Sequence, residues 1–381
     1  DLKGKVRVYC RVRPQLPQEK KSDAQCVAAD DSVVRVEEPK KPAISYEFDA
    51  CFVADQPQQV IFEEIQGVIT SVLDGYNVCV FAYGQTGSGK TYTMEGVPGN
   101  RGITYRTVDR LFEQIESRKP AYHYTVSLTV IEVYNENIYD ILRKGNREDR
   151  LEMRTYNGRC QVLDAATVSV SNAAEVTPIL NRAFAGRSCG STALNERSSR
   201  SHCLLTFYIT GVNMVSKTKV TGKLNLIDLA GSERTAKSKA EGERLCEANC
   251  INRSLSNLGR VICALHQKAT HIPYRDSKLT LLLQDSLSRD SKTILIANIG
   301  PSLSCASETL STLAFASSVR KLELGEAKRS VTSLTTKRRN SRLRSYPVGR
   351  AISADRGRGH SLTAWEPEED FEADSDPEGE S

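Results

Sequence analysis

Two hydrophobic patterns alternate along the chain between about residues 6 and 323. Short runs that are almost continuously apolar stand between longer stretches in which apolar residues recur at helical spacing. The apolar runs predict strands at 6–12, 78–83, 126–134, 204–209, 224–227 and 294–297. Continuous apolar runs that end in glycine turns are typical of central strands covered on both faces. The pattern therefore predicts an α/β fold of three layers, a sandwich in which helices cover both faces of one sheet.

The helical pattern is clear around residues 255–265. One face of the predicted helix is apolar and consists of Leu255, Leu258, Ile262 and Leu265. The opposite face is polar and consists of Arg253, Asn257 and Arg260. Further basic residues stand before and after the helix, at Lys237, Lys239, Lys268, His271, Arg275 and Lys278. We expect the apolar face to pack and the basic side to meet an acidic partner, although an ordinary solvated helix face has the same pattern.

Composition limits the classes of partner. The 381 residues include 52 Lys+Arg and 47 Asp+Glu, and a net charge of +5 argues against a surface built to coat nucleic acid. No apolar run approaches the roughly 18 residues that a membrane span needs, and residues 1–5 show no signal-peptide core. Eleven cysteines lie scattered, several of them in apolar runs, which favours a reducing compartment. We expect an intracellular protein with no membrane span and no nucleic-acid partner.

The character of the sequence changes after residue 323. From about residue 326, basic residues and serines replace the aliphatic periodicity, and residues 366–380 contain acids but no base. Such a composition predicts a disordered tail. We therefore divide the chain into a short leading segment at 1–5, a folded domain at 6–323 and a tail at 324–381. The tail reads as a solvated linker, or alternatively as a phosphorylated segment with candidate sites at Ser330, Ser341, Ser345 and Ser353.

A glycine-rich segment, "GQTGSGKT" at residues 84–91, follows the predicted strand at 78–83 and fits the phosphate-binding P-loop pattern in full. Its glycines let backbone N–H groups curve around a phosphate, Lys90 reaches the β- and γ-phosphates, and Thr91 offers its hydroxyl to Mg²⁺. The expected nucleotide ligands are Gly84, Gln85, Thr86, Gly87, Ser88, Gly89, Lys90 and Thr91. The segment predicts a P-loop NTPase-like fold.

Two further segments supply what phosphoryl transfer needs beyond phosphate binding. "DLAGSE" at residues 228–233 follows the apolar strand at 224–227, so that a carboxylate and a glycine stand at a strand end. "NERSSRSH" at residues 195–202 combines hydroxyl groups with arginines. Each segment alone could be an ordinary turn, but the three together predict nucleotide hydrolysis.

These three segments, in this order and at these spacings, resemble the P-loop and switch loops of the kinesin motor domain. "RVRP" (11–14), "INRSLSNLG" (251–259) and "HIPYRDSKLT" (271–280) match three more stretches of that family. The likeness covers about residues 3–323. It implies a central sheet of about eight strands, mixed but mostly parallel, with helices on both faces. It also implies that ATP, with Mg²⁺, is hydrolysed rather than GTP.

The resemblance also assigns roles to individual residues. Arg11, Arg13 and Pro14 would border the adenine, and Tyr92 would stack on it. Mg²⁺ would be held by Thr91, Ser199 and, through water, Asp228. The residues expected to act in catalysis are Lys90, Ser199, Arg200, Ser201, Asp228, Gly231 and Glu233. Within that set, Gly231 would sense the γ-phosphate with its N–H, and Arg200 would bridge to Glu233 to close the site.

Plainer interpretations exist for three of these side chains. Tyr92 fits a surface aromatic on a helix, and Arg200 with Glu233 fits a purely structural ion pair. For His202, a structural hydrogen-bonding role is favoured over that of a general base.

The acidic partner implied by the resemblance is the microtubule. The basic residues between 237 and 278 would then form the microtubule-binding surface, and the protein would reside on the cytoskeleton of the cytoplasm, including the spindle. Two functions stay open: a microtubule-stimulated ATPase that produces force, and a nucleotide-gated microtubule-binding protein with little motility. The intact set of catalytic residues favours the first. A nucleic-acid-stimulated ATPase fits the net charge poorly.

Residues 1–5 resemble the junction between a preceding coiled-coil neck and the motor core in the C-terminal-motor, kinesin-14 group. This likeness implies movement toward the microtubule minus end and a homodimer formed through an upstream coiled coil, with the present chain a monomeric fragment. Some plant members of this group carry a calmodulin-responsive segment after the motor. The basic stretch at 337–344 is therefore a candidate calmodulin site, although its apolar anchors are sparse.

Overall fold

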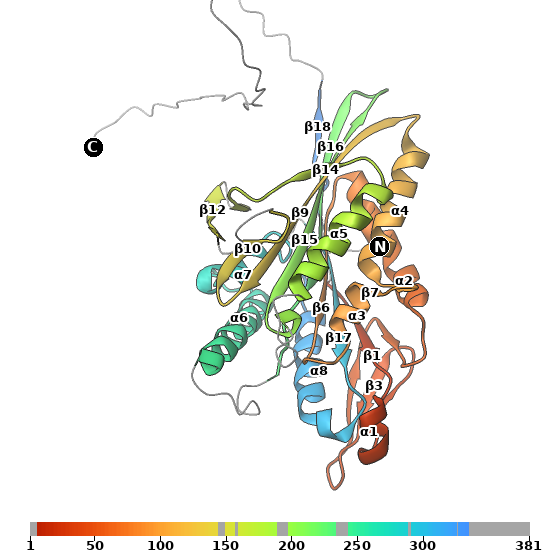
Figure 1. Ribbon diagram of the computed structural model, residues 1–381, viewed down its shortest axis with the longest axis vertical. Coiled ribbons are helices and arrows are strands. Elements are labelled where there is room, and N and C mark those ends of the chain that lie inside the picture. Colours follow the sequence, from red (N-terminus) through yellow and green to blue (C-terminus); the bar gives the residue numbers. More distant parts are fainter. Residues whose placement is uncertain are drawn as a thin grey trace, which may run out of the picture. The chain divides into compact units, whose positions relative to one another are not determined.

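A mixed sheet of eleven strands runs through the centre of the chain (Figure 1). Its main path runs through β11 (Arg150–Leu151), β10 (Asn137–Asp140), β9 (Tyr122–Tyr134), β15 (His202–Asn213), β16 (Thr218–Asp228), β6 (Asn77–Tyr83), β17 (Ser291–Ile299), β1 (Arg7–Val12) and β5 (Ala50–Phe52). Two short strands lie off this path, β14 (Val168–Val170) beside β9 and β18 (Val331–Ser333) beside β16. The computed structural model describes residues 6–143, 149–156, 159–188, 197–233, 243–288, 291–325 and 327–334.

Parallel pairing is confined to one half of this sheet, where β16, β6, β17, β1 and β5 lie side by side. The register places Asp228 beside Ala82, Ala297 beside Tyr83 and Val12 beside Ile299. The carboxyl ends of these parallel strands therefore meet at one edge. At such an edge, loops of distant sequence converge and ligands bind.

Helices cover both faces of the sheet, and each face has its own hydrophobic core (Figure 1). One core contains apolar side chains of α2 (Gln58–Thr70), α3 (Lys90–Met94), α4 (Ile103–Arg118) and α5 (Ala173–Ser188). The other contains those of α6 (Glu243–His266), α7 (Lys278–Leu282) and α8 (Ala306–Arg320). Successive residues of β6 alternate between the two cores, as Val80 and Phe81 do, because strand side chains point to opposite faces in turn.

The smaller elements lie outside the central sheet. They are α1 (Pro17–Ser22), a three-stranded sheet of β2 (Val27–Ala29), β3 (Val33–Val36) and β4 (Ile44–Glu47), and two strand pairs, β7 (Gly96–Val97) with β8 (Asn100–Arg101) and β12 (Met153–Tyr156) with β13 (Arg159–Val162). Short 3₁₀ turns stand at η1 (Ser71–Asp74), η2 (Arg197–Ser199), η4 (Tyr274–Asp276) and η5 (Leu303–Cys305). Within the described residues, no helix is long and apolar enough to cross a bilayer.

The predicted fold class is confirmed: the chain forms a three-layer α/β sandwich around a mixed sheet. All six predicted strands are present, as β1, β6, β9, β15, β16 and β17. The sheet has eleven strands instead of about eight because five short strands join the six predicted ones. Each short strand has too few apolar positions to be recognised from the sequence. Antiparallel pairs outnumber parallel ones, so "mostly parallel" describes only the half that carries the P-loop.

Residues beyond the predicted domain boundary at 323 also pack against the central sheet. Leu324 is buried in the core, and β18 pairs with β16 in antiparallel register, with Ser333 beside Thr218. Ser330 donates its N–H to the carbonyl oxygen of Gly75 (2.8 Å). The apolar alternation of this segment is too short to mark a strand, and its pairing depends on an existing edge. The predicted leading segment at 1–5 and the tail from 335 onward, including the candidate calmodulin stretch, lie outside the described residues.

Candidate nucleotide site and basic surface

The glycine-rich loop lies at the carboxyl edge of the parallel strands, between β6 and α3. Gly84 and Gly87 have φ values of +150° and +76°, a region that side-chain-bearing residues rarely adopt. A Cβ atom on Gly84 would lie 2.1 Å from the carbonyl oxygen of Asn298 on the neighbouring strand. Glycine is therefore required at residue 84 for space as well as for backbone conformation.

The lysine and threonine of the loop are held by short polar contacts. Lys90 is buried, and its Nζ donates to the carbonyl oxygens of Gly84 and Gln85, each at 2.9 Å. Thr91 Oγ1 donates to Asp228 Oδ2 at 2.8 Å. The predicted magnesium ligand on the P-loop and the predicted carboxylate anchor at the end of β16 are therefore in direct contact.

Asp228 has a second partner that sequence reasoning missed. Arg187, at the end of α5, is 2% exposed and donates from Nη1 to Asp228 Oδ2 at 2.8 Å. The same nitrogen lies 3.6 Å from Glu95 Oε1, and Nη2 donates to the carbonyl oxygens of Ser201 (2.8 Å) and Ser198 (3.2 Å). One buried guanidinium thus connects the two predicted switch segments and the end of α3. Burial raises the pKa of Glu95 to about 7, although Arg187 acts to lower it.

Four buried oxygens at this edge have no hydrogen-bond partner within the described part of the chain. They are Oε1 of Gln85, Oγ of Ser88, Oδ1 of Asp228 and Oδ1 of Asn298. Unpartnered buried polar atoms are uncommon in folded proteins and call for a ligand. A carboxylate oxygen suits a water on a divalent cation, and a hydroxyl in a glycine-rich loop suits a phosphate oxygen. The residues present therefore fit a nucleotide with its magnesium ion.

The predicted switch segments are bonded to each other and to the P-loop. Gly231 donates its N–H to the carbonyl oxygen of Ser199 (2.8 Å), and Ser232 donates its N–H to that of Gly84 (3.1 Å). Both carboxylate oxygens of Glu233 accept from Thr86, one from the N–H (2.7 Å) and one from Oγ1 (2.5 Å). These contacts place Glu233 on the P-loop, and the bridge from Arg200 to Glu233 stays a prediction. Ser201 is buried, whereas Ser199 and Arg200 are half-buried.

The predicted base-binding residues form a second group beside the P-loop. Arg11 is buried, and its guanidinium carbon lies 5.0 Å from the centre of the Tyr92 ring. Its Nη1 donates to Gln58 Oε1 and Thr93 Oγ1, both at 2.9 Å, and burial lowers the pKa of Arg11 to about 10. Tyr92 is 39% exposed, so its ring is available to stack against a base. Pro14 is exposed nearby along the chain.

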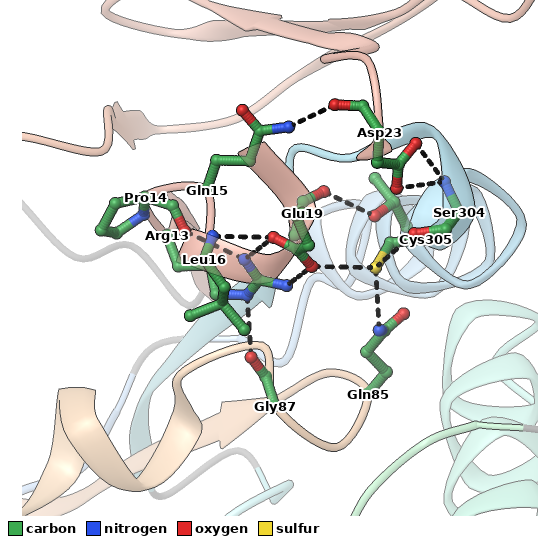
Figure 2. A network of polar contacts seen from close by, with 12 residues as sticks. Arg13, Pro14, Gln15, Leu16, Glu19, Asp23, Gln85, Gly87, Ser304 and Cys305 are labelled. Carbon is green, nitrogen blue, oxygen red and sulfur yellow. Dashed lines mark hydrogen bonds and ion pairs between the residues drawn. The ribbon is translucent and has the colours of Figure 1, made fainter. Parts of the chain in front are cut away.

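Arg13 supports the P-loop in this structure (Figure 2). Its Nε donates to the carbonyl oxygen of Gly87 at 2.8 Å, and its two terminal nitrogens bind Glu19 at 2.7 and 2.5 Å. Glu19, in the first turn of α1, is held on the other side by the N–H of Leu16 (2.9 Å). Hydrogen bonding from Arg13 lowers the pKa of Glu19 to about 2. The motif predicted Arg13 as a base-binding residue, but it did not predict Glu19 as the group that orients it.

We expect Glu19→Gln to weaken ATP binding about ten-fold. The neutral amide keeps the size of the side chain but loses the charged pair, and a hydrogen bond to a charged group contributes about 1.5 kcal/mol or more. Arg13 would then hold the Gly87 carbonyl less firmly. Titration with a fluorescent ATP analogue measures the change. Glu38→Gln, which breaks an exposed pair with Lys41, is the matched control, and equal affinities in both variants would contradict the role of Glu19.

The raised pKa of Glu95 predicts a pH-dependent stability. The folded-state pKa of about 7 lies above the usual value near 4.5, so the folded chain binds the extra proton between these limits. Wild-type stability should therefore fall as the pH rises from about 4.5 to 7. Glu95→Gln removes this loss and should stabilise the chain by at most about 3 kcal/mol at pH 8, with little gain at pH 5. Urea unfolding at the two pH values measures the difference, and an equal gain at both would contradict the assignment.

The predicted basic surface lies on and after α6. Arg253, Arg260, Lys268, His271, Arg275 and Lys278 are all exposed, and Lys237 and Lys239 lie outside the described residues. Arg260 pairs with Asp276 at 2.7 Å, which reduces its contribution to the positive charge. The prediction that Asn257 projects with these residues is wrong, because Asn257 is buried and donates to the Asp276 carbonyl oxygen at 2.8 Å. Asn257 lies on α6 at the border between the apolar and the basic face, where it bonds to Asp276 of the η4 turn.

A strand, a glycine-rich loop with its lysine and threonine, and a carboxylate on the neighbouring strand together define a nucleotide site of the P-loop NTPase class. Comparison with known proteins narrows the class. The model of the kinesin motor domain family matches residues 11–322. The chain belongs to the kinesin motor domain family.

Relatives and solved structures agree with this assignment. The kinesin-like protein KIN-14E of Oryza sativa subsp. japonica is 46% identical over 336 residues, which cover 87% of this chain and 31% of the relative. KIN-14S of Arabidopsis thaliana is 44% identical, over 86% of this chain and 44% of the relative. A KIF14 dimer bound with AMP-PNP to a microtubule is 35% identical, with a TM-score of 0.81 over 86% of this chain and 96% of the other. A fast kinesin is 36% identical, with a TM-score of 0.80 over 89% and 98%.

The named relatives confirm the resemblance to the kinesin-14 group. The chain spans about a third of the length of the first of these curated relatives. The shared region includes the P-loop, both predicted switch segments and the predicted basic surface.

Proposed function

We propose that this chain hydrolyses ATP in a microtubule-stimulated manner and uses the cycle to move or to exert force along microtubules. The observation that carries the proposal is the direct bonding of three loops at one strand edge. Gly231 bonds to Ser199, and Glu233 bonds to Thr86, so the segments expected to contact a γ-phosphate are in place around a complete P-loop. Membership of the kinesin family supports ATP as the nucleotide and the microtubule as the partner.

Mg²⁺ would be held by Thr91, Ser199 and, through water, by Asp228. When bound with ATP, the ion would neutralise charge that develops on the phosphates. Arg187 and Thr91 both donate to Asp228 Oδ2, which leaves Oδ1 as the oxygen available to a metal-bound water. These residues thus fix the carboxylate in one orientation before any ligand arrives.

Phosphate binding must exchange hydrogen bonds that this structure already contains. Lys90 donates to carbonyl oxygens of its own loop, and it would turn to the β- and γ-phosphates. Gly231 would give up the carbonyl oxygen of Ser199 to donate to the γ-phosphate. Arg200 would draw Glu233 from Thr86 to close the site over the nucleotide, with Ser201 orienting the attacking water. Lys90 and Gly231 thus keep an acceptor after the exchange, whereas the carbonyl oxygens that they release need water or another donor.

The basic surface of Arg253, Arg260, Lys268, His271, Arg275 and Lys278, joined by Lys237 and Lys239, would bind the acidic face of tubulin. Such a surface steers an acidic partner and gives an affinity that falls with salt. The kinesin-14 likeness supports movement toward the minus end, a dimer formed through an upstream coiled coil, and residence on cytoplasmic microtubules and the spindle.

Steady-state ATPase rates measured alone, with microtubules and with DNA test the proposal. Stimulation by microtubules and not by DNA is the expected result. Microtubule binding that changes with nucleotide state, but without stimulated turnover, would favour the nucleotide-gated binding protein instead. Equal rates under all three conditions, together with microtubule binding that does not change with nucleotide state, would overturn both.

A further inference from the structure

His202 stands at the junction of three elements that the nucleotide cycle must coordinate. It is 2% exposed and begins β15, directly after Arg200 and Ser201. Its Nδ1 accepts the N–H of Ala230 at 3.0 Å, and its Nε2 lies 2.8 Å from Ser254 Oγ on α6. Ser254 in turn donates its hydroxyl to the carbonyl oxygen of Ile251, also at 2.8 Å.

The direction of each bond follows from its chemistry. A backbone N–H can only donate, so Nδ1 of His202 must be the unprotonated ring nitrogen. The hydrogen then lies on Nε2 and is donated to Ser254, whose own hydrogen goes to Ile251. Burial, together with the positive charges of Arg187 and Lys90, lowers the pKa of His202 to about 3 and keeps the ring neutral. The result is one ordered chain of hydrogen bonds from Ala230 to the backbone of α6.

The two ends of this series of hydrogen bonds, at Ala230 and at Ser254, lie beside residues with proposed functions. Ala230 immediately precedes Gly231, the residue proposed to sense the γ-phosphate, and the two share a peptide bond. Ser254 is buried, but Arg253 beside it on α6 is exposed as part of the basic surface. Because Ala230 is covalently joined to Gly231, a displacement of Gly231 toward a phosphate would shift Ala230 and its N–H, so the ring must follow Ala230 or lose the bond.

We propose that His202 is a positioning residue that couples the nucleotide loops to the microtubule-binding helix through Ser254. The inference rests on the proposed function and identifies the side chains by which its two sites communicate. Because the ring is rigid, it cannot keep both partners when they separate by more than a few tenths of an ångström. The bond to Ser254 therefore depends on the position of Ala230, and α6 adjusts when Ala230 moves.

Two substitutions test the coupling between the nucleotide loops and α6 in a chain that still folds. Ser254→Ala removes the acceptor on α6, and His202→Asn places an acceptor oxygen where Nδ1 stands but cannot reach Ser254. Ser256→Ala changes an exposed serine on the same helix and serves as the matched control. The first readout is the ratio of microtubule affinities in co-pelleting with AMP-PNP and with ADP. The second is the stimulation of ATP turnover by microtubules.

Ser254→Ala should leave basal turnover within about two-fold and reduce both the affinity ratio and the stimulation about ten-fold, as the loss of one buried hydrogen bond implies. His202→Asn should do the same, and the double variant should be no worse than either single one. A folded Ser254→Ala variant with the wild-type ratio would overturn the inference, as would an equal loss in Ser256→Ala. A wild-type chain without microtubule stimulation would instead overturn the proposed function, and this inference with it.

Discussion

Glu233→Ala is expected to reduce ATP turnover about 100-fold or more while ATP still binds within a few-fold of normal. The described hydrogen bonds of the carboxylate go to Thr86 of the P-loop, a residue other than the lysine and threonine expected to bind the phosphates and Mg²⁺, so nucleotide affinity should survive. In the proposed mechanism, in contrast, closure of the predicted switch segments needs Glu233 as the partner of Arg200. A catalytic group misplaced by about 1 Å can cost two orders of magnitude in rate. Steady-state turnover and titration with a fluorescent ATP analogue measure the two quantities.

Two companion variants decide which contact of Glu233 matters. Arg200→Ala should match the loss in Glu233→Ala if the two side chains close the site together, and Thr86→Val should then have a much smaller effect. If Thr86→Val instead causes a larger loss of turnover than Arg200→Ala, Glu233 acts by holding the P-loop. Glu113→Ala, which removes an exposed carboxylate paired with Arg110, controls for the loss of one charge. Near-normal turnover in Glu233→Ala would remove the closing step from the mechanism.

The strands and the P-loop could be predicted because their signals are local. A strand buried on both faces, such as β6, must be apolar throughout, and the loop after it must carry glycine where φ is positive. Periodicity also located the apolar face of α6, and Leu258 and Ile262 are buried as expected. Short edge strands such as β18 carry too few residues for either signal, and they pair only because a neighbouring edge is available.

The side chains that orient the site could not be predicted in this way. Glu19 and Arg187 belong to no recognised motif, and each meets its partner through the tertiary fold: Glu19 supports the P-loop through Arg13, and Arg187 reaches Asp228 from α5. A motif contains residues that touch the ligand, whereas the residues that hold them depend on which helix covers which strand end. A buried arginine near the end of a helix has the same sequence appearance as an exposed one. Burial and pairing alone distinguish Arg187 from Arg118.

Arg187→Ala is expected to cause the largest loss of stability, about 3–5 kcal/mol. The guanidinium is buried with Asp228 and close to the half-buried Glu95, and its removal takes the cation away from both carboxylates. Breaking a buried ion pair by removing one partner has costs of this size, because the remaining charge is desolvated and uncompensated. The carbonyl oxygens of Ser198 and Ser201 lose a donor as well. Urea unfolding followed by circular dichroism measures the loss.

Two matched variants test whether the unpaired charge is the cause. Arg118→Ala removes an arginine whose ion pair with Asp74 is partly exposed, and it should cost about 0–1 kcal/mol. Combining Arg187→Ala with Glu95→Gln removes one of the carboxylates that lost its cation, so at pH 8 Glu95→Gln should stabilise the Arg187→Ala variant more than it stabilises the wild type. If the two gains are equal, the instability of Arg187→Ala arises from the missing hydrogen bonds to Ser198 and Ser201. Arg187 would then act by holding the backbone of the predicted switch segment rather than as the counter-charge of Asp228.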